Sequence, residues 1–586
     1  MKILGLSFDY HDAAAALLID DVIVAAAEEE RFSRNKHDAS YPAKAIAFCL
    51  EQGGIAASEL DAVVFYEKPL LKFERLLANA ARAFPRSLPF LKGAVESWFR
   101  QGKFDVRPRI TADLGIDPGK IHLISHHMSH AAASFFSSPF EQATVVTLDG
   151  VGEFDTATIS LADRSGLRVL HRYTYPHSIG LLYSAITAFL GFEVNEGEYK
   201  VMGMAGFGQP TSVDKIRRLI QHGQGRFKID LSYFNFFNPT DSFASPKLYE
   251  LLGEPRAPES PFDIGDRSQP AEPGSVQALS RHYADIAASL QQVVEEVILD
   301  VAGDAIRRTG VKNLVLGGGV SLNSMANGRI LRELRVPLYI HPAAGDAGGA
   351  LGAALYHRVV ERGLSRPKPL TSAYLGKAYG DDAIRKALKQ AAVSSVTEIG
   401  DEAAFFARVA ALLQEGKVVG WHQGRFEWGP RALGARSILA NPCLPTMQRT
   451  INEKIKFREP FRPFAPAILS EKATDYFEME PPRDSSQPEN FMLAVHRVRP
   501  DKRAVIPAVT HADGTARVQL LFPQSGSRFR RLVEEFDRLT GVPVLLNTSF
   551  NRRGEPIVSS PEDALQTFLW SGLDVLVMSN FIIGKE

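Results

Sequence analysis

The sequence is poor in cysteine and has no long apolar run. Only Cys49 and Cys443 occur in 586 residues, which excludes a disulfide framework and a zinc site built from cysteine. No segment approaches the roughly 18 to 20 consecutive apolar residues that a membrane span needs. The first ten residues include the acid Asp9 and no small-residue cleavage site follows, unlike in a signal peptide. We therefore expect a cytoplasmic protein with no membrane partner.

The chain also lacks an excess of charge of either sign. Lys plus Arg number 67 and Asp plus Glu number 67, so the net charge is zero. Proteins that bind nucleic acid or an acidic membrane over much of their surface normally carry a basic excess. We therefore expect no nucleic-acid partner, and any basic site has to be local. With 45% hydrophobic and 23% charged residues, the composition is that of a globular protein, and the length predicts about three or four domains.

Two parts of the sequence share one arrangement of predicted strands. Each part has three strands in a row, and an acid closes the first strand of each. The predicted strands are residues 2–8, 13–19 and 22–27 in the first part and 144–148, 156–162 and 167–173 in the second. The closing acids are Asp9 and Asp149. This pattern predicts a duplicated α/β core of the actin-like and sugar-kinase-like (ASKHA) class, in which nucleotide binds between the two halves.

Features further along the chain fit the same class of fold. They are an amphipathic helix at 276–308, a strand at 313–316, the glycine turn Gly317-Gly318-Gly319-Val320 with Asn323, a strand at 336–340 and a helix at 347–359. Residues 234–274 lack clean periodicity, so we predict an irregular insertion or lid, within an inserted region of about 210–275. A Pro-containing linker near 365–370 predicts two domains, 1–370 and 371–586.

Histidines and carboxylates in the first domain have the spacing of a metal site. His126 and His130 are four residues apart at the start of a predicted helix, so both lie on one face. Asp149 and Asp346 lie in loops that face the cleft in a duplicated fold of this kind. Two His and two Asp suit a catalytic Fe(II), Mn(II) or Zn(II) better than a closed structural zinc. The alternative for the two histidines is a role in capping the helix or in packing the core. The alternative for Asp149 alone is the role of the acid that binds magnesium and its water in a kinase.

The second domain contains a basic, glycine-rich segment. Residues 425–462 include eight Lys or Arg and three acids, in a chain whose net charge is zero. Arginine forks with exposed backbone amides are typical of sites that bind phosphates and carboxylates. Arg517, Asn547 and Ser549, on later strand-and-loop segments, could surround the same pocket. The alternative is a solvated basic face, but Gly, Pro, Trp and Phe separate these charges, which favours a site.

Seven groups of residues carry a resemblance to a known family. They are Ser7-Phe8-Asp9-Tyr10-His11-Asp12-Ala13-Ala14, Glu28-Glu29-Glu30-Arg31-Phe32-Ser33-Arg34, His126-His127-Met128-Ser129-His130-Ala131, Asp149-Gly150-Val151-Gly152-Glu153, Glu196-Gly197-Glu198-Tyr199-Lys200-Val201-Met202-Gly203, Gly317 to Val320 with Asn323, and the C-terminal segments above. In combination they resemble the NodU/CmcH type of O-carbamoyltransferases over the whole chain. One departure is Met204-Ala205-Gly206-Phe207-Gly208, where that family usually has Leu-Ala-Pro-Tyr-Gly.

The resemblance implies a division of labour between the domains. It implies that residues 371–586 are similar to the YrdC threonylcarbamoyl-AMP synthase and form carbamoyl-AMP from carbamoyl phosphate and ATP with Mg²⁺. It implies that residues 1–370 are similar to the actin-like tRNA threonylcarbamoyl transferase and pass the carbamoyl group to a hydroxyl of a small-molecule acceptor, a sugar or a secondary metabolite. Fe(II) is the metal ion that the resemblance implies, with Mn or Zn as alternatives.

The resemblance implies the metal ligands His126, His130, Asp149 and Asp346, and the mechanism expected from the two sites gives roles to the other residues. The expected catalytic residues are His11, Asp9, Asp12 and Lys200, and our hypothesis is that His11 takes the proton of the acceptor hydroxyl. The expected nucleotide-binding residues are Glu198, Gly317, Gly318 and Asn323. The residues expected to bind carbamoyl phosphate and ATP are Arg431, Arg436, Ser437, Lys456, Arg458, Arg462, Arg517, Asn547 and Ser549.

Three other functions compete with this interpretation. An actin-fold small-molecule kinase explains Asp149 and the glycine turn, but it gives the two histidines and the basic segment no role. A tRNA threonylcarbamoyl transferase shares both domain types, but the neutral net charge disfavours RNA binding. A non-catalytic metal-binding scaffold would retain metal without turning over nucleotide. A homodimer is compatible with the sequence.

Overall fold

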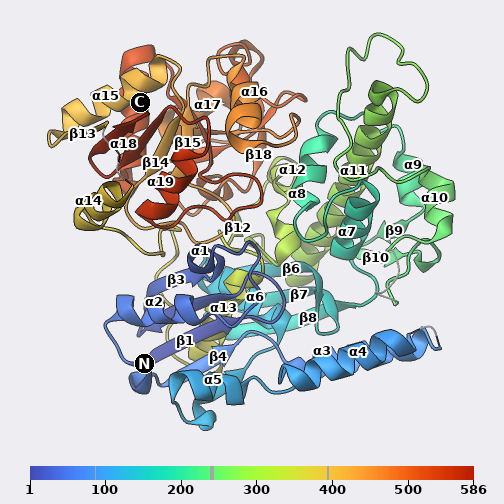
Figure 1. The fold of residues 1–586 in the computed structure, drawn as a ribbon. Helices are drawn as coiled ribbons and strands as arrows, with labels where there is room; N and C mark the ends of the chain where they lie inside the picture. Colours follow the sequence, from blue (N-terminus) through green and yellow to red (C-terminus); the bar gives the residue numbers. More distant parts are fainter. Residues whose placement is uncertain (86, 238–242, 392, 394, 586) are drawn as a thin grey trace. The chain divides into compact units, whose positions relative to one another are not determined.

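The computed structural model describes residues 1–85, 87–237, 243–391, 393 and 395–585 (Figure 1). The chain divides into two compact units. Unit 1 comprises Met1–Asp9, Ala16–Ile23 and Gly54–Lys368, and unit 2 comprises Tyr10–Ala15, Val24–Gly53 and Pro369–Glu586. Two N-terminal segments thus belong to the same unit as the C-terminal part of the chain. The assignment of functional domains to 1–370 and 371–586 stays a prediction.

Two five-stranded sheets have the same strand order. The first has the order β3-β2-β1-β4-β5 and the second has the order β8-β7-β6-β11-β12. Their strands are β1 (Lys2–Ser7), β2 (Ala14–Ile19), β3 (Val22–Glu28), β4 (Ala62–Phe65), β5 (Ile121–Leu123), β6 (Gln142–Gly152), β7 (Asp155–Asp163), β8 (Gly166–Thr174), β11 (Leu314–Gly317) and β12 (Leu338–Ile340). In both sheets the first strand pairs in parallel with the fourth, and the fourth with the fifth. This repeated topology confirms the predicted duplicated α/β fold of the actin-like class.

The first strand of each half is more irregular at its end than predicted. Asp9 and Asp12, just beyond β1, adopt positive φ angles of 73° and 54°, a conformation that Asp tolerates better than most residues. β6 continues four residues past the predicted end and its pairing with β7 shifts register between Leu148 and Gly152. A bulge of this kind changes the direction of side chains. Asp149 lies within it.

Helices α6 (His126–Phe136) and α13 (Asp346–Tyr356) of unit 1 pack against each other and against strands of these two sheets, and the unit also contains other helices and one small β-hairpin (Figure 1). The other helices are α3 (Pro69–Arg82), α4 (Leu88–Arg100), α5 (Arg107–Leu114), α7 (Ile179–Phe189), α8 (Glu198–Ala205), α9 (Val213–Arg217), α10 (Pro246–Leu252), α11 (Val276–Thr309) and α12 (Ser324–Leu334). The hairpin consists of β9 (Ile220–Gly223) and β10 (Arg226–Ile229). Among the described residues, none of these helices combines the length and apolar composition that crossing a bilayer requires.

The predicted irregular insertion is only partly irregular. Pro246 at the first turn and Gly253 after the last residue delimit α10 within the 234–274 stretch, so the prediction was wrong for that segment. Residues 238–242 of the stretch lie outside the described residues. The long helix α11 was predicted to within one residue. Its ends have strong signals, because Ser275 accepts a hydrogen bond from the Ala278 amide and Gly310 adopts the left-handed conformation.

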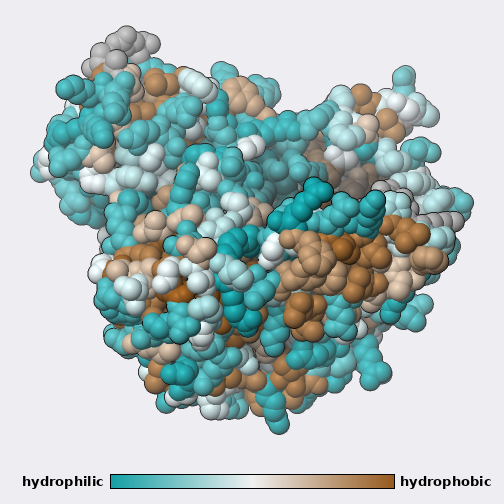
Figure 2. Space-filling view, turned by 60° about the horizontal axis from the view of Figure 1, so that its bottom comes forward, coloured by the Kyte–Doolittle hydropathy of each residue, from teal (hydrophilic) through white to brown (hydrophobic). Residues whose placement is uncertain are grey.

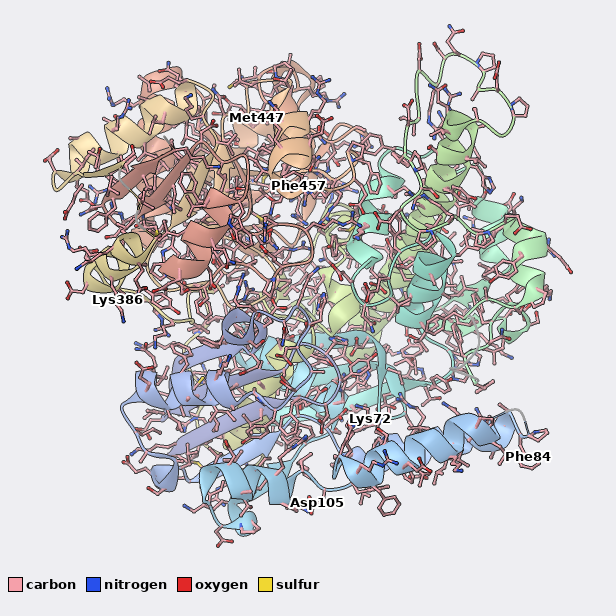
Figure 3. The ribbon with its side chains drawn as sticks, viewed as in Figure 1. Lys72, Phe84, Asp105, Lys386, Met447 and Phe457 are labelled. Atoms are coloured by element: carbon pink, nitrogen blue, oxygen red, sulfur yellow. The ribbon has the colours of Figure 1, made fainter. Side chains whose placement is uncertain are left out.

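Helices α3 and α4 form a pair that extends to one side of unit 1 (Figure 1). Phe84 lies at the far end of the pair (Figure 3). Phe73, Trp98 and Phe104 pack against one another between the helices, with ring centroids 4.6 to 5.4 Å apart. Large apolar side chains remain exposed on the pair, and Figure 2 shows hydrophobic residues gathered on the face that carries it.

Unit 2 contains an eight-stranded mixed sheet of order β13-β23-β22-β14-β15-β21-β16-β20. These strands are β13 (Val396–Glu398), β14 (Val419–His422), β15 (Arg436–Ala440), β16 (Ala465–Leu469), β20 (Gln519–Leu521), β21 (Val544–Ser549), β22 (Val575–Met578) and β23 (Phe581–Gly584). A small sheet has β17 (Phe477–Glu478), β18 (Val495–Val498) and β19 (Thr515–Arg517). The helices are α1 (Glu30–Ser33), α2 (Ala43–Gly53), α14 (Asp381–Gln390), α15 (Glu402–Gln414), α16 (Met447–Ile451), α17 (Ala473–Tyr476), α18 (Arg528–Thr540) and α19 (Pro561–Leu569).

The N-terminal segments of unit 2 are bound tightly to its C-terminal part. Arg31 donates to the carbonyl oxygen of Gly429 at 2.7 Å, and the amide of Gly429 donates to Glu28 at 2.7 Å. Arg34 donates to the carbonyl oxygens of Pro556 and Ile557 at 3.0 and 2.7 Å. These charged side chains lie largely out of solvent, so the motif Glu28 to Arg34 is a structural part of unit 2.

Candidate functional site

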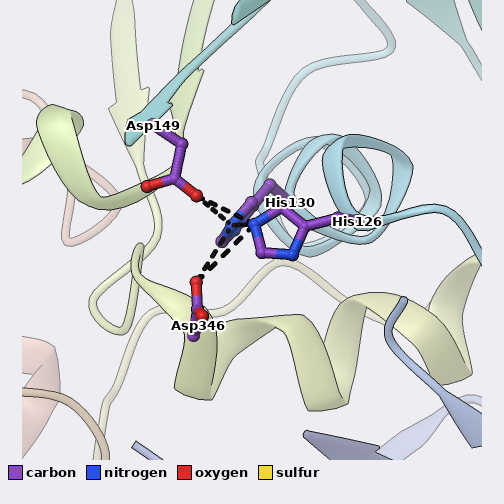
Figure 4. Close-up of side chains that lie close together, drawn as sticks. All are labelled: His126, His130, Asp149 and Asp346. Carbon is purple, nitrogen blue, oxygen red and sulfur yellow. Dashed lines mark hydrogen bonds and ion pairs between the residues drawn. The ribbon is translucent and has the colours of Figure 1, made fainter. Parts of the chain in front are cut away.

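Four side chains of unit 1 converge on one point (Figure 4). His126 and His130 come from the first turns of α6, as the spacing predicts, while Asp149 comes from the bulge of β6 and Asp346 is the first residue of α13. The two histidines and Asp346 are almost completely buried, and Asp149 is slightly exposed. The structure therefore brings together the four residues predicted as metal ligands.

The distances among these side chains fit a single metal ion. The Nε2 atoms of His126 and His130 are 3.0 Å apart. Asp149 Oδ2 lies 2.8 and 3.2 Å from them, and Asp346 Oδ1 lies 3.7 and 3.5 Å from them. Ligands about 2.1 Å from a metal are about 3.0 Å apart at octahedral right angles and about 3.4 Å apart in a tetrahedron. Two imidazoles and two carboxylates with this spacing could hold a divalent cation.

The electrostatics of the cluster favour a cation. Burial acts to lower the pKa of His130, but hydrogen bonds to Asp149 and Asp346 raise that pKa to about 9. Burial acts to raise the pKa of Asp149, but both histidines hold that pKa well below its ordinary value. The ionised Asp149 carboxylate thus lies in a buried volume, where the positive charge of a protonated histidine or of a metal ion offsets it.

Glycines bring the backbone close to the candidate ligands. Asp149 Oδ1 accepts hydrogen bonds from the amides of Gly150 and Gly319, at 2.9 and 3.3 Å, which leaves Oδ2 directed at the histidines. At Gly318, with φ of 86°, a Cβ atom would lie 2.3 Å from the carbonyl oxygen of Leu148. A Cβ atom at Gly352 of α13 would lie 1.8 Å from the carbonyl oxygen of Ser129 of α6. Only glycine permits these approaches, so it fixes the loop and the helix pair that position the site.

Two residues beside the site were not predicted. The hydroxyl of Tyr66, at the end of β4, donates to Asp346 Oδ2 at 3.4 Å. Glu153 Oε1 accepts the amide of His126 at 3.3 Å and that of Lys68 at 2.8 Å. Glu153 belongs to a motif that the sequence displayed, but its role depends on a bend at φ of 56°. No pattern in the sequence around Tyr66 predicts its contact with Asp346.

His127 is distinct from its two histidine neighbours. Its ring nitrogens bond to the hydroxyl of Thr147 and the carbonyl oxygen of Asp155, at 2.7 and 2.9 Å. Burial, followed by the charge of His126, lowers the pKa of His127 to about 3. A neutral histidine with both ring nitrogens occupied is a packing residue, and the chain thus separates one structural histidine from two candidate ligands.

The predicted catalytic residues fall into three local groups. In unit 1, Asp9 pairs with Arg109, and the ammonium group of Lys200 lies 5.7 Å from the centre of the Phe192 ring. In unit 2, one oxygen of Asp12 accepts a hydrogen bond from His11 Nδ1 at 2.9 Å, and the other accepts one from His37 Nδ1 at 2.8 Å. His37 was not predicted. The catalytic roles of His11, Asp9, Asp12 and Lys200 stay predictions.

The predicted nucleotide-binding residues have local structural partners. Glu198 accepts from the Ser184 hydroxyl at 2.7 Å and the Asn195 amide at 3.1 Å. Asn323 caps α12 by accepting from the Ala326 amide and exchanges hydrogen bonds with the Gln291 side chain. Gly317 ends β11 and lies close to the backbone of His130, and Gly318 follows it. Nucleotide binding by Glu198, Gly317, Gly318 and Asn323 stays a prediction.

Five of the predicted cations form a cluster in unit 2. Burial and the positive charges of Arg431 and Arg462 hold the pKa of Arg517 well below its usual range. Burial and the charges of Arg458 and Arg462 do the same for the pKa of Lys456. Cations that depress one another's pKa values raise the local positive potential. This cluster is therefore a candidate anion site.

Polar side chains lie on the neighbouring strand β21. Lys456 Nζ donates to Ser549 Oγ at 3.1 Å and to Asn551 Oδ1 at 2.7 Å. Asn547 donates to the carbonyl oxygen of Ala432, next to Arg431, while its own Oδ1 is buried and has no hydrogen-bond partner among the described residues. A buried acceptor without a partner is costly, and a bound donor would satisfy it.

The side chains of Arg436 and Ser437 form hydrogen bonds with the backbone of unit 2. Arg436 is completely buried, and its guanidinium donates to the carbonyl oxygens of Ser559, Gln423 and Gly424 at 3.0, 2.8 and 3.1 Å. Ser437 Oγ accepts the Gly434 amide at 3.1 Å. The guanidinium of Arg436 is therefore committed to holding loops together, and direct phosphate binding by these two residues stays a prediction.

The fold and the buried cluster define an actin-like α/β protein with a candidate divalent-metal centre. Residues 2–355 match the family described as Carbamoyltransferase N-terminus, and residues 410–585 match Carbamoyltransferase C-terminus. The chain belongs to the carbamoyltransferase family. It is 43% identical over 617 residues to an uncharacterised protein of Synechocystis sp., covering 100% of this chain and 96% of that protein. It is 36% identical over 592 residues to the nodulation protein NolNO of Sinorhizobium fredii, and the match covers 98% of this chain and 79% of NolNO.

Solved structures resemble the chain only weakly. The activator of 2-hydroxyisocaproyl-CoA dehydratase from Clostridium difficile matches 61% of this chain and 94% of its own, at 17% identity and a TM-score of 0.31. The actin-like assignment therefore depends on the strand order shared by the two five-stranded sheets.

Proposed function

We propose that the chain is an O-carbamoyltransferase that uses both units. Unit 2 forms carbamoyl-AMP from ATP and carbamoyl phosphate, and the metal centre of unit 1 is where the carbamoyl group passes to a hydroxyl of a small-molecule acceptor. The observation that carries the proposal is the buried convergence of His126, His130, Asp149 and Asp346 in a member of the carbamoyltransferase family.

In unit 1 the four clustered residues would hold Fe(II), with Mn(II) or Zn(II) as alternatives. A divalent ion there would offset the negative charge that develops on the leaving phosphate. Gly150 and Gly319 orient Asp149 through their amides, and Tyr66 orients Asp346 through its hydroxyl. Such partners fix the direction in which a ligand presents its oxygen.

His11 is the proposed base for the acceptor hydroxyl. Asp12 holds His11 Nδ1 at 2.9 Å, so the imidazole accepts a proton at Nε2 while the carboxylate stabilises the resulting charge. Lys200 and Glu198, two residues apart at the start of α8, would contact the nucleotide. A helix N-terminus adds favourable electrostatics for a phosphate.

In unit 2 the cation cluster would bind the two phosphate-bearing substrates. Arg431, Arg462 and Arg517 would offset phosphate charge, and the buried oxygen of Asn547 would accept from the carbamoyl amide. One water is consumed, and one orthophosphate and one pyrophosphate leave for each carbamoyl-AMP formed. Arg436 would support the loop that carries this group through its hydrogen bonds to the carbonyl oxygens of Ser559, Gln423 and Gly424.

The decisive experiment omits the acceptor. Purified protein is incubated with ATP, Mg²⁺, Fe(II) and carbamoyl phosphate under argon, and the products are followed by mass spectrometry and a pyrophosphate assay. Pyrophosphate release that depends on carbamoyl phosphate is the expected result. Arg517→Met should lower that release by at least about 100-fold, since it removes a charge from the cluster. Arg538→Met, at an exposed ion pair of α18, is the matched control.

Other products would identify the competing functions. ADP in place of AMP and pyrophosphate would favour a small-molecule kinase. Turnover that requires threonine and bicarbonate instead of carbamoyl phosphate would favour a threonylcarbamoyl transferase. Absence of nucleotide turnover in a protein that retains metal would leave a scaffold role and overturn the proposal.

A further inference from the structure

The α3–α4 pair concentrates positive charge in a neutral chain. Residues 68–103 contain eight Lys or Arg and two Glu, a net charge of +6, whereas the whole chain has a net charge of zero. Among the described residues of this segment, Lys68, Arg82, Lys92 and Arg100 are exposed. The excess positive charge of the segment therefore reaches the solvent.

The same segment concentrates exposed apolar surface. Six of the fifteen large hydrophobic side chains that are exposed among the described residues lie between positions 70 and 99. Leu70 and Leu77, two helical turns apart on one face of α3, are 64% and 41% exposed. Phe84 at the far end of the pair is 67% exposed and Phe99 is 70% exposed. Exposed apolar residues in such density mark an interaction surface.

This apolar surface is not a byproduct of loose helix packing. Phe73 of α3 packs against the buried Trp98 of α4, and Phe104, which follows α4, packs against both rings. The pair thus has an internal aromatic core of its own and presents a second set of apolar side chains outward. Figure 2 shows this set as a hydrophobic area with hydrophilic residues beside it.

The charge and the shape of the α3–α4 pair indicate which partner would cover its exposed surface. A second copy of the chain would bring two surfaces of net positive charge together, which like-charge repulsion opposes. The pair extends to one side of unit 1 (Figure 1), and its exposed leucine and phenylalanine side chains suit a deformable apolar medium. Basic residues beside exposed Leu and Phe are typical of helices that lie at the headgroup level of an anionic bilayer.

We propose that the α3–α4 pair is a docking surface for an anionic lipid bilayer, with its apolar side chains at the acyl boundary and its Lys and Arg at the headgroups. The surface is independent of the carbamoyl-transfer proposal, because none of its exposed residues belongs to the candidate sites. It departs from the expectation of no membrane partner, which depended on the lack of a long apolar run and on the net charge of the whole chain.

Vesicle co-sedimentation of the full chain tests the proposal. Vesicles of phosphatidylcholine alone are compared with vesicles that contain 30% phosphatidylglycerol. The expected result is binding to the anionic vesicles that weakens with added salt. Lys92→Glu with Arg100→Glu should lower the partition coefficient by about 25-fold or more, at about fivefold for each positive charge removed. Lys386→Glu with Lys389→Glu, on α14 of unit 2, makes the same change in net charge and should leave binding unchanged.

A second pair of variants tests the apolar contribution. Phe84→Glu with Phe99→Glu should abolish sedimentation with anionic vesicles, while Leu279→Glu, at an exposed leucine of α11, should not. Circular dichroism checks the fold of each variant. Phe84→Trp retains an apolar side chain and should retain binding, and its fluorescence should be quenched by brominated lipid.

Three results would overturn the proposal. The first is equal vesicle binding by the surface variants and their controls. The second is the absence of binding at 30% phosphatidylglycerol by the unmodified chain. The third is a dimer in lipid-free sedimentation that Phe84→Glu with Phe99→Glu converts to monomer, which would make a second copy the occupant.

Discussion

At the scale of single residues, the candidate metal centre depends on each of its four converging side chains. His130→Ala removes one of two imidazoles whose Nε2 atoms lie 3.0 Å apart. Loss of a partner of a metal ligand typically lowers affinity by about 10- to 100-fold, so loss of a ligand should lower Zn(II) affinity by more than about 100-fold. Isothermal titration with Zn(II) measures this. His282→Ala, on α11, should bind as the unmodified chain does, and equal affinity of both variants would contradict the assignment.

Arg436 should matter for stability more than for phosphate binding. Arg436→Met removes the guanidinium that donates to the carbonyl oxygens of Ser559, Gln423 and Gly424, and it leaves the buried Gln423 carbonyl without that donor. We expect a loss of about 3 kcal/mol or more in the stability of unit 2. Chemical denaturation followed by tryptophan fluorescence reports this, because Trp421 and Trp428 are buried in the same unit. The exposed-site variant Arg538→Met should keep the denaturation midpoint. A stable Arg436→Met protein with weakened phosphate binding would contradict this role.

The pair of His37 and Asp12 should make stability depend on pH. Burial acts to lower the pKa of His37, but the Asp12 carboxylate raises it above 6.5. A group whose pKa is higher in the folded than in the unfolded state stabilises the folded state. This stabilisation is complete at pH values below the unfolded-state pKa and is lost as the pH rises through the folded-state pKa. His37→Gln should therefore lower the thermal midpoint more at pH 5.5 than at pH 9. Equal losses at both pH values would show that the pair contributes no charge interaction.

Residue types and spacing were enough to predict the four clustered residues of unit 1. His126 and His130 have the i, i+4 spacing, and each aspartate follows a strand or opens a helix. The partners of Arg436 could not be predicted, because a sequence shows that an arginine is present but not that backbone carbonyls surround it. His37 and Tyr66 reach their partners through tertiary contacts between segments distant in sequence.

At the scale of elements, the distance between α6 and α13 sets the geometry of the candidate metal centre. Gly352→Ala would place a methyl group 1.8 Å from the carbonyl oxygen of Ser129, so the two helices have to separate. Overpacking of this kind costs about 1 to 3 kcal/mol. Asp346 starts one helix and His130 lies on the other, so Zn(II) affinity should fall although no ligand changes.

The control for this prediction is a glycine with space around it. Gly93, on α4, has no atom within 4 Å of its added Cβ position. Gly93→Ala should stabilise slightly, by about 0.5 to 1 kcal/mol, because alanine favours the helix. Unchanged metal affinity and thermal midpoint in Gly352→Ala would show that α6 and α13 tolerate separation.

Elements with strong local signals were predicted closely, and those governed by tertiary structure were not. Val276–Thr309 has an N-cap serine and a C-terminal glycine, and its prediction was accurate to one residue. β6 was predicted to end at Leu148, but it passes through a bulge to Gly152 because β7 continues to pair with it. Hydrophobic periodicity alone does not reveal such a bulge.

At the scale of the whole molecule, the composition of unit 2 determines which fragments can fold. If the chain is cut at residue 369, the C-terminal fragment lacks residues 24–53. In the full chain this segment supplies Arg31, Arg34 and Glu28 to the C-terminal part of unit 2. The fragment 369–586 should therefore aggregate or unfold without a cooperative transition, as thermal circular dichroism would show. A soluble fragment that unfolds as cooperatively as the full chain would contradict this expectation.

Glu153 gives the α3–α4 pair a mechanical connection to the candidate metal centre. One carboxylate oxygen accepts the amide of Lys68, immediately before α3, and the amide of His126 at the start of α6. The helix pair is thus an arm whose inner end is anchored to a proposed metal ligand. A displacement of α3 that pulled the Lys68 amide away from Glu153 would therefore disturb an oxygen that also accepts the His126 amide.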